Sequence, residues 1–105
     1  MQQASFATIL AVSALVWTSP ALANGDAAAG KAKAIVCSGC HGPDGNSVNP
    51  IWPKLAGQHE AYLIKVLKDY RSGVRRNATM KAMARPLSDA DIANLAAFYA
   101  RQVQK

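Results

Sequence analysis

The spacing of apolar positions along the chain predicts three α-helices. The first is expected from residue 26 or 27 to 38, the second from 59 to 72, and the third from 88 nearly to the C-terminus. Apolar residues recur in each segment at intervals of three or four, as on one face of a helix. These stripes are Ala28, Ala32, Ile35 and Val36; then Tyr62, Leu63, Val66, Leu67 and Tyr70; then Ile92, Leu95, Ala96, Tyr99 and Val103. No alternating stretch indicates a β-strand, so the predicted fold class is all-α.

Residues that cap helices support these boundaries. Asp26 can cap the first helix, Gly73 is placed to end the second, and Ser88 with Asp91 three positions later is close to a capping box. The two segments between the helices, around residues 41–58 and 74–86, are expected to be loops. Both are long for connections in so short a chain, so we expect them to line a site.

A long uncharged apolar run lies near the N-terminus, over residues 6–17. A membrane-spanning helix needs about 20 apolar residues, so this run is too short to cross a bilayer well. The following Ala21-Leu22-Ala23 fits the small-x-small pattern of a signal-peptidase site. We therefore predict a signal peptide over residues 1–23, cleaved after Ala23, and export to the periplasm. Residues 1–3 lack the usual Lys or Arg, and a buried helix or an uncleaved anchor is the alternative interpretation.

Removal of that segment leaves residues 24–105, a length that excludes a multidomain enzyme. So small a chain buries too little apolar surface to offset its conformational entropy easily. Its two cysteines supply at most one disulfide. We therefore expect a bound cofactor or metal to stabilise the fold.

The two cysteines belong to the segment Cys37-Ser38-Gly39-Cys40-His41, which has the Cys-x-x-Cys-His pattern of c-type haem attachment. Residues three apart near a helix end lie on one face, so both thiols can reach the two vinyl groups of one haem. The adjacent His41 can then offer an imidazole nitrogen to the iron. Attachment of this kind takes place outside the bacterial cytoplasm, which agrees with the predicted export.

Three other kinds of site use the same residues. A thioredoxin-like dithiol needs a helix after a buried strand, and no strand is predicted. A zinc site would have to combine Cys37, Cys40, His41 and His59, whose spacing is unlike that of common zinc modules. A disulfide between Cys37 and Cys40 would close a very small loop and stabilise little. The pattern favours haem over all three.

A second axial ligand could come from His59, Met80 or Met83. His59 falls at the start of a predicted helix and is expected at the surface. Both methionines lie in the long second loop, where a thioether could pack over the haem. Their spacing barely separates them, and the one that does not ligate is expected to fill a gap in the core.

Taken together, these residues resemble the small bacterial class I cytochromes c. The chain is similar to mono-haem, c-553-like carriers and to one domain of their di-haem periplasmic relatives. The resemblance implies a cytochrome c fold over residues 24–105, with three main helices plus loops wrapped around one covalently bound haem. The matching segments are 37–42, 44–46, 53–58, Tyr62-Leu63, the Met80 loop, 87–92 and 95–99.

The resemblance also implies particular site residues. In that family the axial methionine precedes the Ser of a Leu-Ser-Asp segment by eight positions, which here selects Met80 relative to Ser88. Met83 is then the less favoured alternative. The family further implies that the Pro53 carbonyl accepts a hydrogen bond from the second nitrogen of His41. The iron would therefore be held by His41 and Met80.

Further contacts are implied for the aromatic residues. The family crosses its first and last helices at close range, which here would involve Gly30 and either Tyr99 or Phe98. Trp52 and Tyr62 are expected either to pack against the haem or to belong to the core.

A haem held by His and Met has no vacant coordination position, which favours one-electron transfer over oxygen chemistry. We therefore expect a periplasmic electron carrier and not an enzyme. The alternative is a haem-bearing subunit of a periplasmic oxidoreductase, for example a sulfur-compound dehydrogenase. The carrier would be a monomer that does not span the membrane after cleavage.

The formal net charge of +6 indicates what the redox partners look like. Basic residues gather in the middle of the chain and could steer it to acidic docking surfaces on an electron donor and an electron acceptor. Nucleic acid is a poor partner for an exported haem protein. The basic residues are Lys54, Lys65, Lys68, Arg71, Arg75, Arg76, Lys81 and Arg85.

Overall fold

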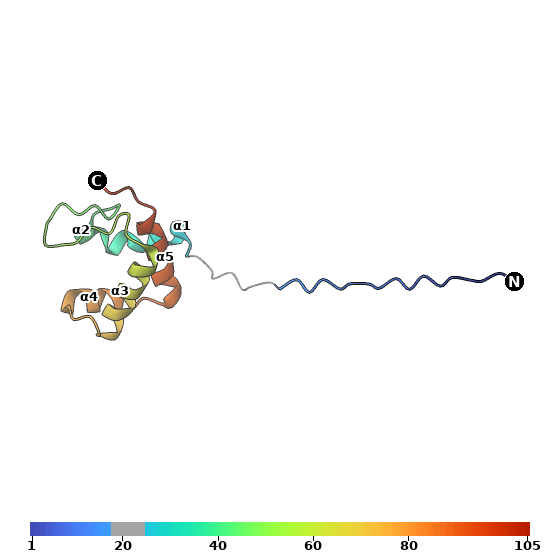
Figure 1. The fold of residues 1–105 in the computed structure, drawn as a ribbon. Helices are drawn as coiled ribbons and strands as arrows, with labels where there is room; N and C mark the ends of the chain where they lie inside the picture. The colour runs from blue at the N-terminus through green and yellow to red at the C-terminus, as the bar shows by residue number, and fades with distance from the viewer. Residues whose placement is uncertain (18–24) are drawn as a thin grey trace.

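The computed structural model describes residues 1–17 and 25–105. The cleavage position predicted after Ala23 lies outside the described residues. Residues 1–17 form no helix or strand, their side chains are exposed, and in Figure 1 they run away from the helices. Phe6 and Trp17 are 93% and 86% exposed, so the apolar run does not add a buried helix to the core. Within the described ranges, no helix is long and apolar enough to span a membrane.

Helices form the folded part of the chain, and no strand occurs in residues 1–17 or 25–105. The elements are α1 (Ala27–Lys33), a 3-10 turn η1 (Ala34–Val36), α2 (Ser38–His41), α3 (Glu60–Ser72), α4 (Ala78–Ala84) and α5 (Asp89–Ala100). The all-α prediction is confirmed. Figure 1 shows α1 beside α5, with α3 and α4 on the other side of α5.

The prediction of one continuous first helix to residue 38 is wrong. The chain tightens into η1 after α1, and the Ser38 hydroxyl donates a 2.7 Å hydrogen bond to the Ile35 carbonyl. A short polar side chain that bonds to a nearby backbone group in this way competes with the helix ladder. The apolar stripe predicted for the first helix is wrong too. Ile35 and Val36 are 72% and 65% exposed, whereas Gly30 and Ala34 are buried.

Gly30 permits the close contact between α1 and α5. A Cβ on this residue would lie 1.9 Å from the Asn94 carbonyl oxygen and 2.9 Å from Phe98 Cβ. The Asp26 backbone N–H adds a 2.8 Å hydrogen bond to Asn94 Oδ1 at the start of α1. The first and last helices therefore cross where the resemblance implies. Of the two aromatic candidates, Phe98 contacts Gly30, and Tyr99 faces elsewhere.

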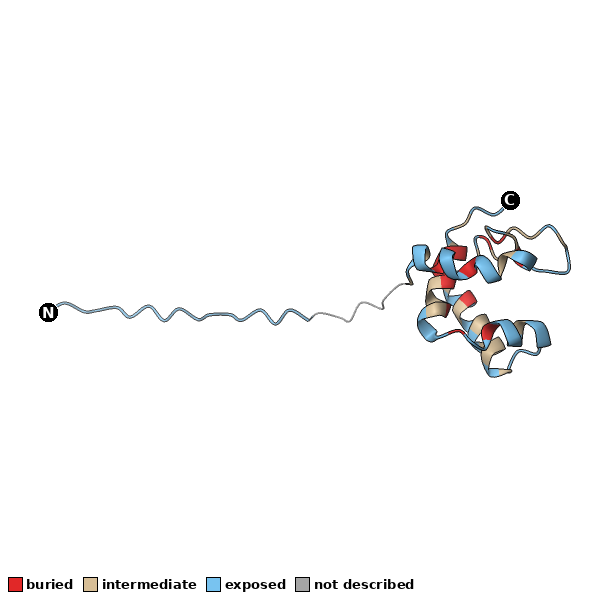
Figure 2. Ribbon diagram, turned by 180° about the vertical axis from the view of Figure 1, so that it is seen from behind, coloured by how far each residue is buried: buried red, intermediate tan, exposed pale blue. Residues whose placement is uncertain are grey.

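The expected caps of the second and third helices are confirmed. Gly73 ends α3 in the left-handed conformation with φ 86°. Ser88 and Asp91 form a complete capping box at the start of α5. α5 supplies most of the core, including Ile92 and Leu95, the largest fully buried side chains of the described residues (Figure 2). Val103 lies beyond α5 and is exposed, so it does not extend the apolar stripe.

The segment between α3 and α5 contains a helix that the sequence pattern did not predict. α4 begins after Asn77, whose side chain accepts a 2.9 Å hydrogen bond from the Met80 backbone N–H. The prediction of a loop over residues 74–86 is therefore wrong for residues 78–84. Asn is a favoured N-cap, and the residues after it are mostly good helix formers, so a local signal was present.

Candidate functional site

A cavity of about 460 Å³ lies between α2, the segment after it, α3, α4 and α5. This volume falls within the range of pockets that hold cofactors and drug-sized ligands. Six of the residues predicted for the site line it: Cys37, Cys40, His41, Pro53, Met80 and Met83. The fold therefore brings together side chains that are up to 46 positions apart in the sequence.

The short helix α2 positions the Cys-x-x-Cys-His segment. Cys37 precedes α2 and is half-buried, Cys40 lies within it and is exposed, and both are free thiols. His41 occupies the last turn and is only 6% exposed. Gly42 then turns the chain away with φ 82°. One turn of helix thus presents two thiols and an imidazole to the same cavity.

The His41 ring is fixed by a 2.8 Å hydrogen bond between its Nδ1 and the Pro53 carbonyl oxygen. Since a carbonyl can only accept, Nδ1 carries the proton and Nε2 is left with a lone pair for a metal. The Gly45 carbonyl accepts hydrogen bonds from Leu55 and Ala56, which folds the segment back and places Pro53 beside the ring. The contact between His41 and Pro53 is present as the resemblance implies.

Both candidate methionines come from α4. They are three positions apart, so they share one face of the helix and both line the cavity. Met80 is half-buried, whereas Met83 is 37% exposed. The structure brings both thioethers to the site, and burial is the only feature that distinguishes Met80 from Met83.

His59 does not join the site. It is exposed, precedes α3 and is absent from the cavity lining. No group of three or more His, Cys, Asp or Glu side chains within the described parts of the chain is arranged to hold a metal ion. The zinc interpretation therefore has no support in the positions of these side chains.

The predicted stripe of the second helix faces the cavity as well as the core. Leu63 is buried, and all five of its members line the cavity: Tyr62, Leu63, Val66, Leu67 and Tyr70. Trp52 and Tyr62 also line it and are 38% and 46% exposed, so the alternative that they are core residues is wrong. They form part of the cavity edge.

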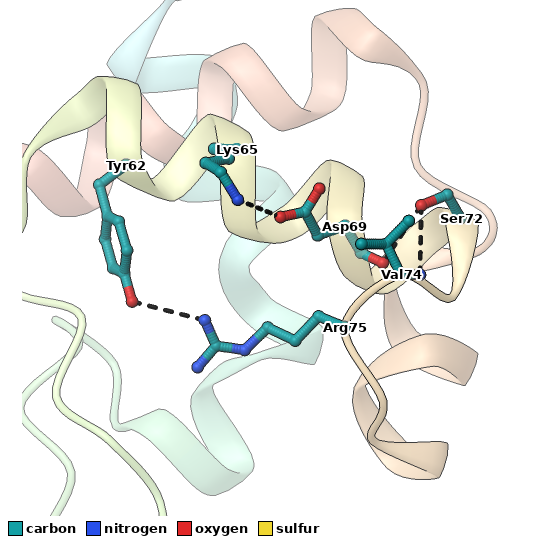
Figure 3. A network of polar contacts seen from close by, with 6 residues as sticks. All are labelled: Tyr62, Lys65, Asp69, Ser72, Val74 and Arg75. Carbon is teal, nitrogen blue, oxygen red and sulfur yellow. Dashed lines mark hydrogen bonds and ion pairs between the residues drawn. The ribbon is translucent and has the colours of Figure 1, made fainter.

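Arg75 extends back along α3 to the Tyr62 hydroxyl, as Figure 3 shows. It is also one of the residues that line the cavity. Its guanidinium carbon lies 5.1 Å from the centroid of the Tyr70 ring, and its Nη1 lies 3.5 Å from the Tyr62 hydroxyl. On the same helix, Lys65 pairs with Asp69 at 2.5 Å. Sequence reasoning placed Arg75 in a basic cluster but not in the site. Its position two residues after Gly73, the glycine that ends α3, was the available signal.

Tyr99 is another residue of the cavity lining that sequence reasoning did not place there. It is buried and belongs to the core cluster against which Cys37 packs. Burial raises the pKa of the Tyr99 phenol, and the neighbouring Cys37 raises it further. Burial also raises the pKa of the Cys37 thiol, while the Tyr99 hydroxyl lowers it in part.

The lining fits a large, flat, mostly apolar group that carries negative charge at its edge. Apolar and aromatic side chains dominate it, and Lys54 and Arg75 are the charged residues among the described ones that line it. The thiols of Cys37 and Cys40 and the free nitrogen of His41 are the groups that attach and ligate a c-type haem. The residues present therefore fit haem c.

Comparison with known proteins agrees with this chemistry. The family model described as Cytochrome c matches residues 22–100. The chain is 56% identical over 79 residues to cytochrome c4 of Thiocapsa roseopersicina, covering 74% of this chain and 41% of that protein. It is 49% identical over 81 residues to cytochrome c-554(548) of Halomonas halodenitrificans, covering 74% and 98%. It is 39% identical over 95 residues to a thiosulfate dehydrogenase electron acceptor of Thiomonas intermedia, covering 89% and 42%.

A solved structure shows the same fold. Reduced recombinant cytochrome c4 from Pseudomonas stutzeri superimposes with a TM-score of 0.74 at 44% identity, covering 77% of this chain and 47% of that one. The chain thus spans less than half the length of the cytochrome c4 proteins that it matches.

Proposed function

Because the chain belongs to the cytochrome c family, whose members bind haem c covalently, we propose that it is a one-electron carrier between redox proteins. The observation that carries this proposal is the 2.8 Å bond from His41 Nδ1 to the Pro53 carbonyl. That bond leaves Nε2 of a buried imidazole facing a cavity of cofactor size, next to two free thiols. Among the described residues, the cavity lining includes no Asp or Glu. We propose no enzymatic activity.

Each residue of the site has a separate task. Cys37 and Cys40 would form the two thioethers, and His41 and Met80 would hold the iron. When bound, the haem supplies one iron that changes charge by a single electron. The apolar residues of α3 exclude water from the site, which favours the less charged ferrous state, and a methionine ligand favours it further. A haem held by His41 and Met80 would therefore serve electron transfer rather than oxygen or peroxide chemistry.

We propose that this electron transfer takes place in the periplasm, after removal of residues 1–23 by cleavage following Ala23. The apolar run 6–17 is exposed and contributes nothing to the core, as expected of a segment that is removed. Residues 24–105 would then form the single cytochrome c domain. The family match over residues 22–100 supports this boundary.

A second candidate function is that of a haem-bearing subunit of an oxidoreductase. The likeness to a thiosulfate dehydrogenase electron acceptor favours it. The two roles differ in their assembly, because a carrier would elute alone as a monomer and a subunit would co-purify with a second chain.

The visible absorption spectrum tests the proposed function. The full chain would be exported in a host with cytochrome maturation machinery and measured oxidised and reduced. A low-spin c-type spectrum, with haem retained under denaturing conditions, is the expected result. A protein without covalent haem would contradict the proposal, and would favour a dithiol function for Cys37 and Cys40.

The partners proposed for this carrier have acidic docking surfaces. Within residues 75–85 the chain carries four basic residues and no acidic one: Arg75, Arg76, Lys81 and Arg85, here called the α4 basic group. None of the four takes part in an ion pair with a described residue, whereas Lys65 and Arg71 of the predicted cluster pair with Asp69 and Asp89. The α4 basic group is therefore free of ion pairs with described residues, and one of its members, Arg75, lines the cavity.

We expect this charge to govern the rate of electron transfer with small charged reagents. The oxidation rate by anionic ferricyanide should fall about tenfold or more between low and high salt, because screening removes attraction. With a cationic cobalt complex the rate should rise as salt is added, because screening then removes repulsion. The variant that combines Arg76→Gln, Lys81→Gln and Arg85→Gln should show a weaker dependence of the rate on salt concentration with both reagents. The control is Lys31→Gln on exposed α1, which should leave this dependence unchanged. An equal dependence on salt in all variants would contradict the proposal.

A further inference from the structure

The chain after α5 is tied to the loop that joins α2 to α3. Residues 101–105, here called the post-α5 segment, lie beside residues 42–59, here called the proximal loop (Figure 1). The Asn46 side chain links the two. Its Nδ2 donates a hydrogen bond to the Val103 carbonyl at 2.9 Å, and its Oδ1 accepts one from the Lys105 N–H at 2.8 Å. One amide side chain thus joins backbone groups that lie 57 and 59 positions away in the sequence.

The residues on either side of that asparagine hold the two sides of Pro53. The Gly45 carbonyl accepts a 2.8 Å hydrogen bond from the Leu55 N–H, two positions after Pro53. The Ser47 hydroxyl donates a 2.6 Å hydrogen bond to the Trp52 carbonyl, one position before it. A displacement of the asparagine would therefore move Pro53 with it.

The backbone of Asn46 also lies against the residue that follows His41. A Cβ on Gly42 would lie 2.8 Å from the Asn46 carbonyl oxygen. The Gly45 N–H donates a 3.2 Å hydrogen bond to the Gly42 carbonyl. Asn46 thus connects the backbone next to His41 with the part of the loop that carries Pro53.

The proximal loop has little burial to hold it in place. None of residues 46–54 is buried, and Pro53, whose carbonyl bonds to His41, is itself exposed. A segment with few buried contacts opens locally at low cost unless hydrogen bonds hold it. Lys54, the residue after Pro53, donates a further hydrogen bond from its Nζ to the Lys105 carbonyl. The post-α5 segment therefore holds the loop from outside at two points.

We propose that Asn46, anchored on the post-α5 segment, is the positioning residue that keeps the Pro53 carbonyl on His41 Nδ1. The inference rests on the proposed ligation of iron by His41. The 2.8 Å bond to Pro53 fixes the imidazole ring and raises its basicity as a ligand. None of residues 101–105 lines the cavity, yet through Asn46 they control the geometry of this axial ligand.

The Asn46→Ala variant tests this role in the reduced, haem-loaded protein. The exchange of the His41 Nδ1 proton with solvent, followed by NMR, reports on the bond to Pro53. We expect this exchange to become about tenfold faster or more, because two hydrogen bonds that hold the loop are lost. The matched control is Asn49→Ala, in the same loop, whose Oδ1 accepts a 3.0 Å bond from the nearby Ile51 N–H. An unchanged rate in Asn46→Ala, or an equal acceleration in Asn49→Ala, would overturn the inference.

Two substitutions at Lys105 show whether the anchor is the backbone of the post-α5 segment. Lys105→Pro removes the N–H that donates to Asn46. Lys105→Ala keeps this N–H and removes the ammonium group that pairs with Asp44 at 3.1 Å. Lys105→Pro should accelerate exchange at His41 and Lys105→Ala should not, and the opposite pattern would overturn the inference. In the Asn46→Ala background, Lys105→Pro should add nothing, because the bond is already lost.

The same spectra separate a positioning role from a general loss of stability. The backbone amide of Leu95, in the buried part of α5, reports unfolding of the whole domain. It should exchange at the wild-type rate in Asn46→Ala, and an equal acceleration at Leu95 and His41 would overturn the inference. If Asn46→Ala gave no folded protein, Lys105→Pro with its Lys105→Ala control would decide the question.

These measurements also separate this inference from the proposed function. A wild-type protein without covalent haem would end both. A wild-type protein with haem on both cysteines, whose His41 proton exchanges at the same rate in Asn46→Ala, would end the inference alone.

Discussion

A chain in which Cys37 and Cys40 are both replaced by Ala is expected to carry no covalent haem and to be largely unfolded. The first part follows from loss of both proposed thioethers. The second follows from the size of the cavity, which the protein must otherwise keep open. Without haem, the apolar side chains that line this cavity stay in contact with water and lose the packing that haem would supply. Natural domains have only about 5–15 kcal/mol of stability, so loss of the centre of the core is expected to remove most of it.

The remaining core is too small to compensate. Ile92 and Leu95 are the largest side chains that are fully buried among the described residues, and the apolar stripe of α3 faces the cavity as well as the core. A chain of this length rarely gains more than about 3–5 kcal/mol from a core of its own. Haem is therefore expected to act as the centre of the core as well as the redox group.

Far-UV circular dichroism, together with haem staining after denaturing electrophoresis, measures both effects. The matched control is Gly39→Ala within the same attachment segment, because a Cβ at Gly39 meets no atom within 4 Å. This control should retain haem and helix content. A Cys37→Ala/Cys40→Ala protein with wild-type helix content and a cooperative thermal transition would show that the fold does not depend on haem.

The sequence predicted well those elements whose ends depend on local signals. Gly73 ends α3 because only a residue without Cβ adopts a left-handed conformation without strain, and Ser88 with Asp91 completes a capping box. The Cys-x-x-Cys-His segment could also be predicted from the sequence, because its chemistry depends on residue types at short spacing. Such features require no knowledge of the rest of the chain.

Features that depend on distant parts of the chain were missed. The buried face of α1 is set by Gly30, which packs on the backbone of Asn94 far along the sequence. α4 was assigned to a loop because its apolar residues face a cavity and show no long periodicity. Periodicity cannot tell a residue that faces a cofactor from one that faces the core, and the stripe of α3 shows this directly.

Tyr99 illustrates the same limit at the site. The resemblance offered either Tyr99 or Phe98 for the contact between the first and last helices, and Phe98 makes that contact. Tyr99 lines the cavity and buries its hydroxyl, a polar group that an apolar pattern ignores. Whether a tyrosine serves through its ring or through its oxygen is decided by packing, so no sequence period reveals it.

The choice between Met80 and Met83 leads to the other large expected effect. Met80→Ala should keep its haem, because the thioethers are untouched, and should lose the weak far-red band that marks a methionine bonded to ferric iron. The iron should become partly high-spin. The potential should fall by on the order of 0.1 V or more, since axial ligands move haem potentials across about 0.8 V. Visible spectroscopy and redox titration measure these changes.

Met83→Ala is the matched control, since it removes the same side chain from the same face of α4. Met83 is 37% exposed and Met80 is half-buried, so the deeper thioether is the one expected on the iron. The Asn77 cap strengthens this assignment, because it fixes the backbone of Met80 itself at the start of the helix. Met83→Ala should therefore retain the far-red band and a potential close to that of the wild type. The opposite pattern would place Met83 on the iron, and loss of the band in both variants would mean that α4 must hold its full packing to present either thioether.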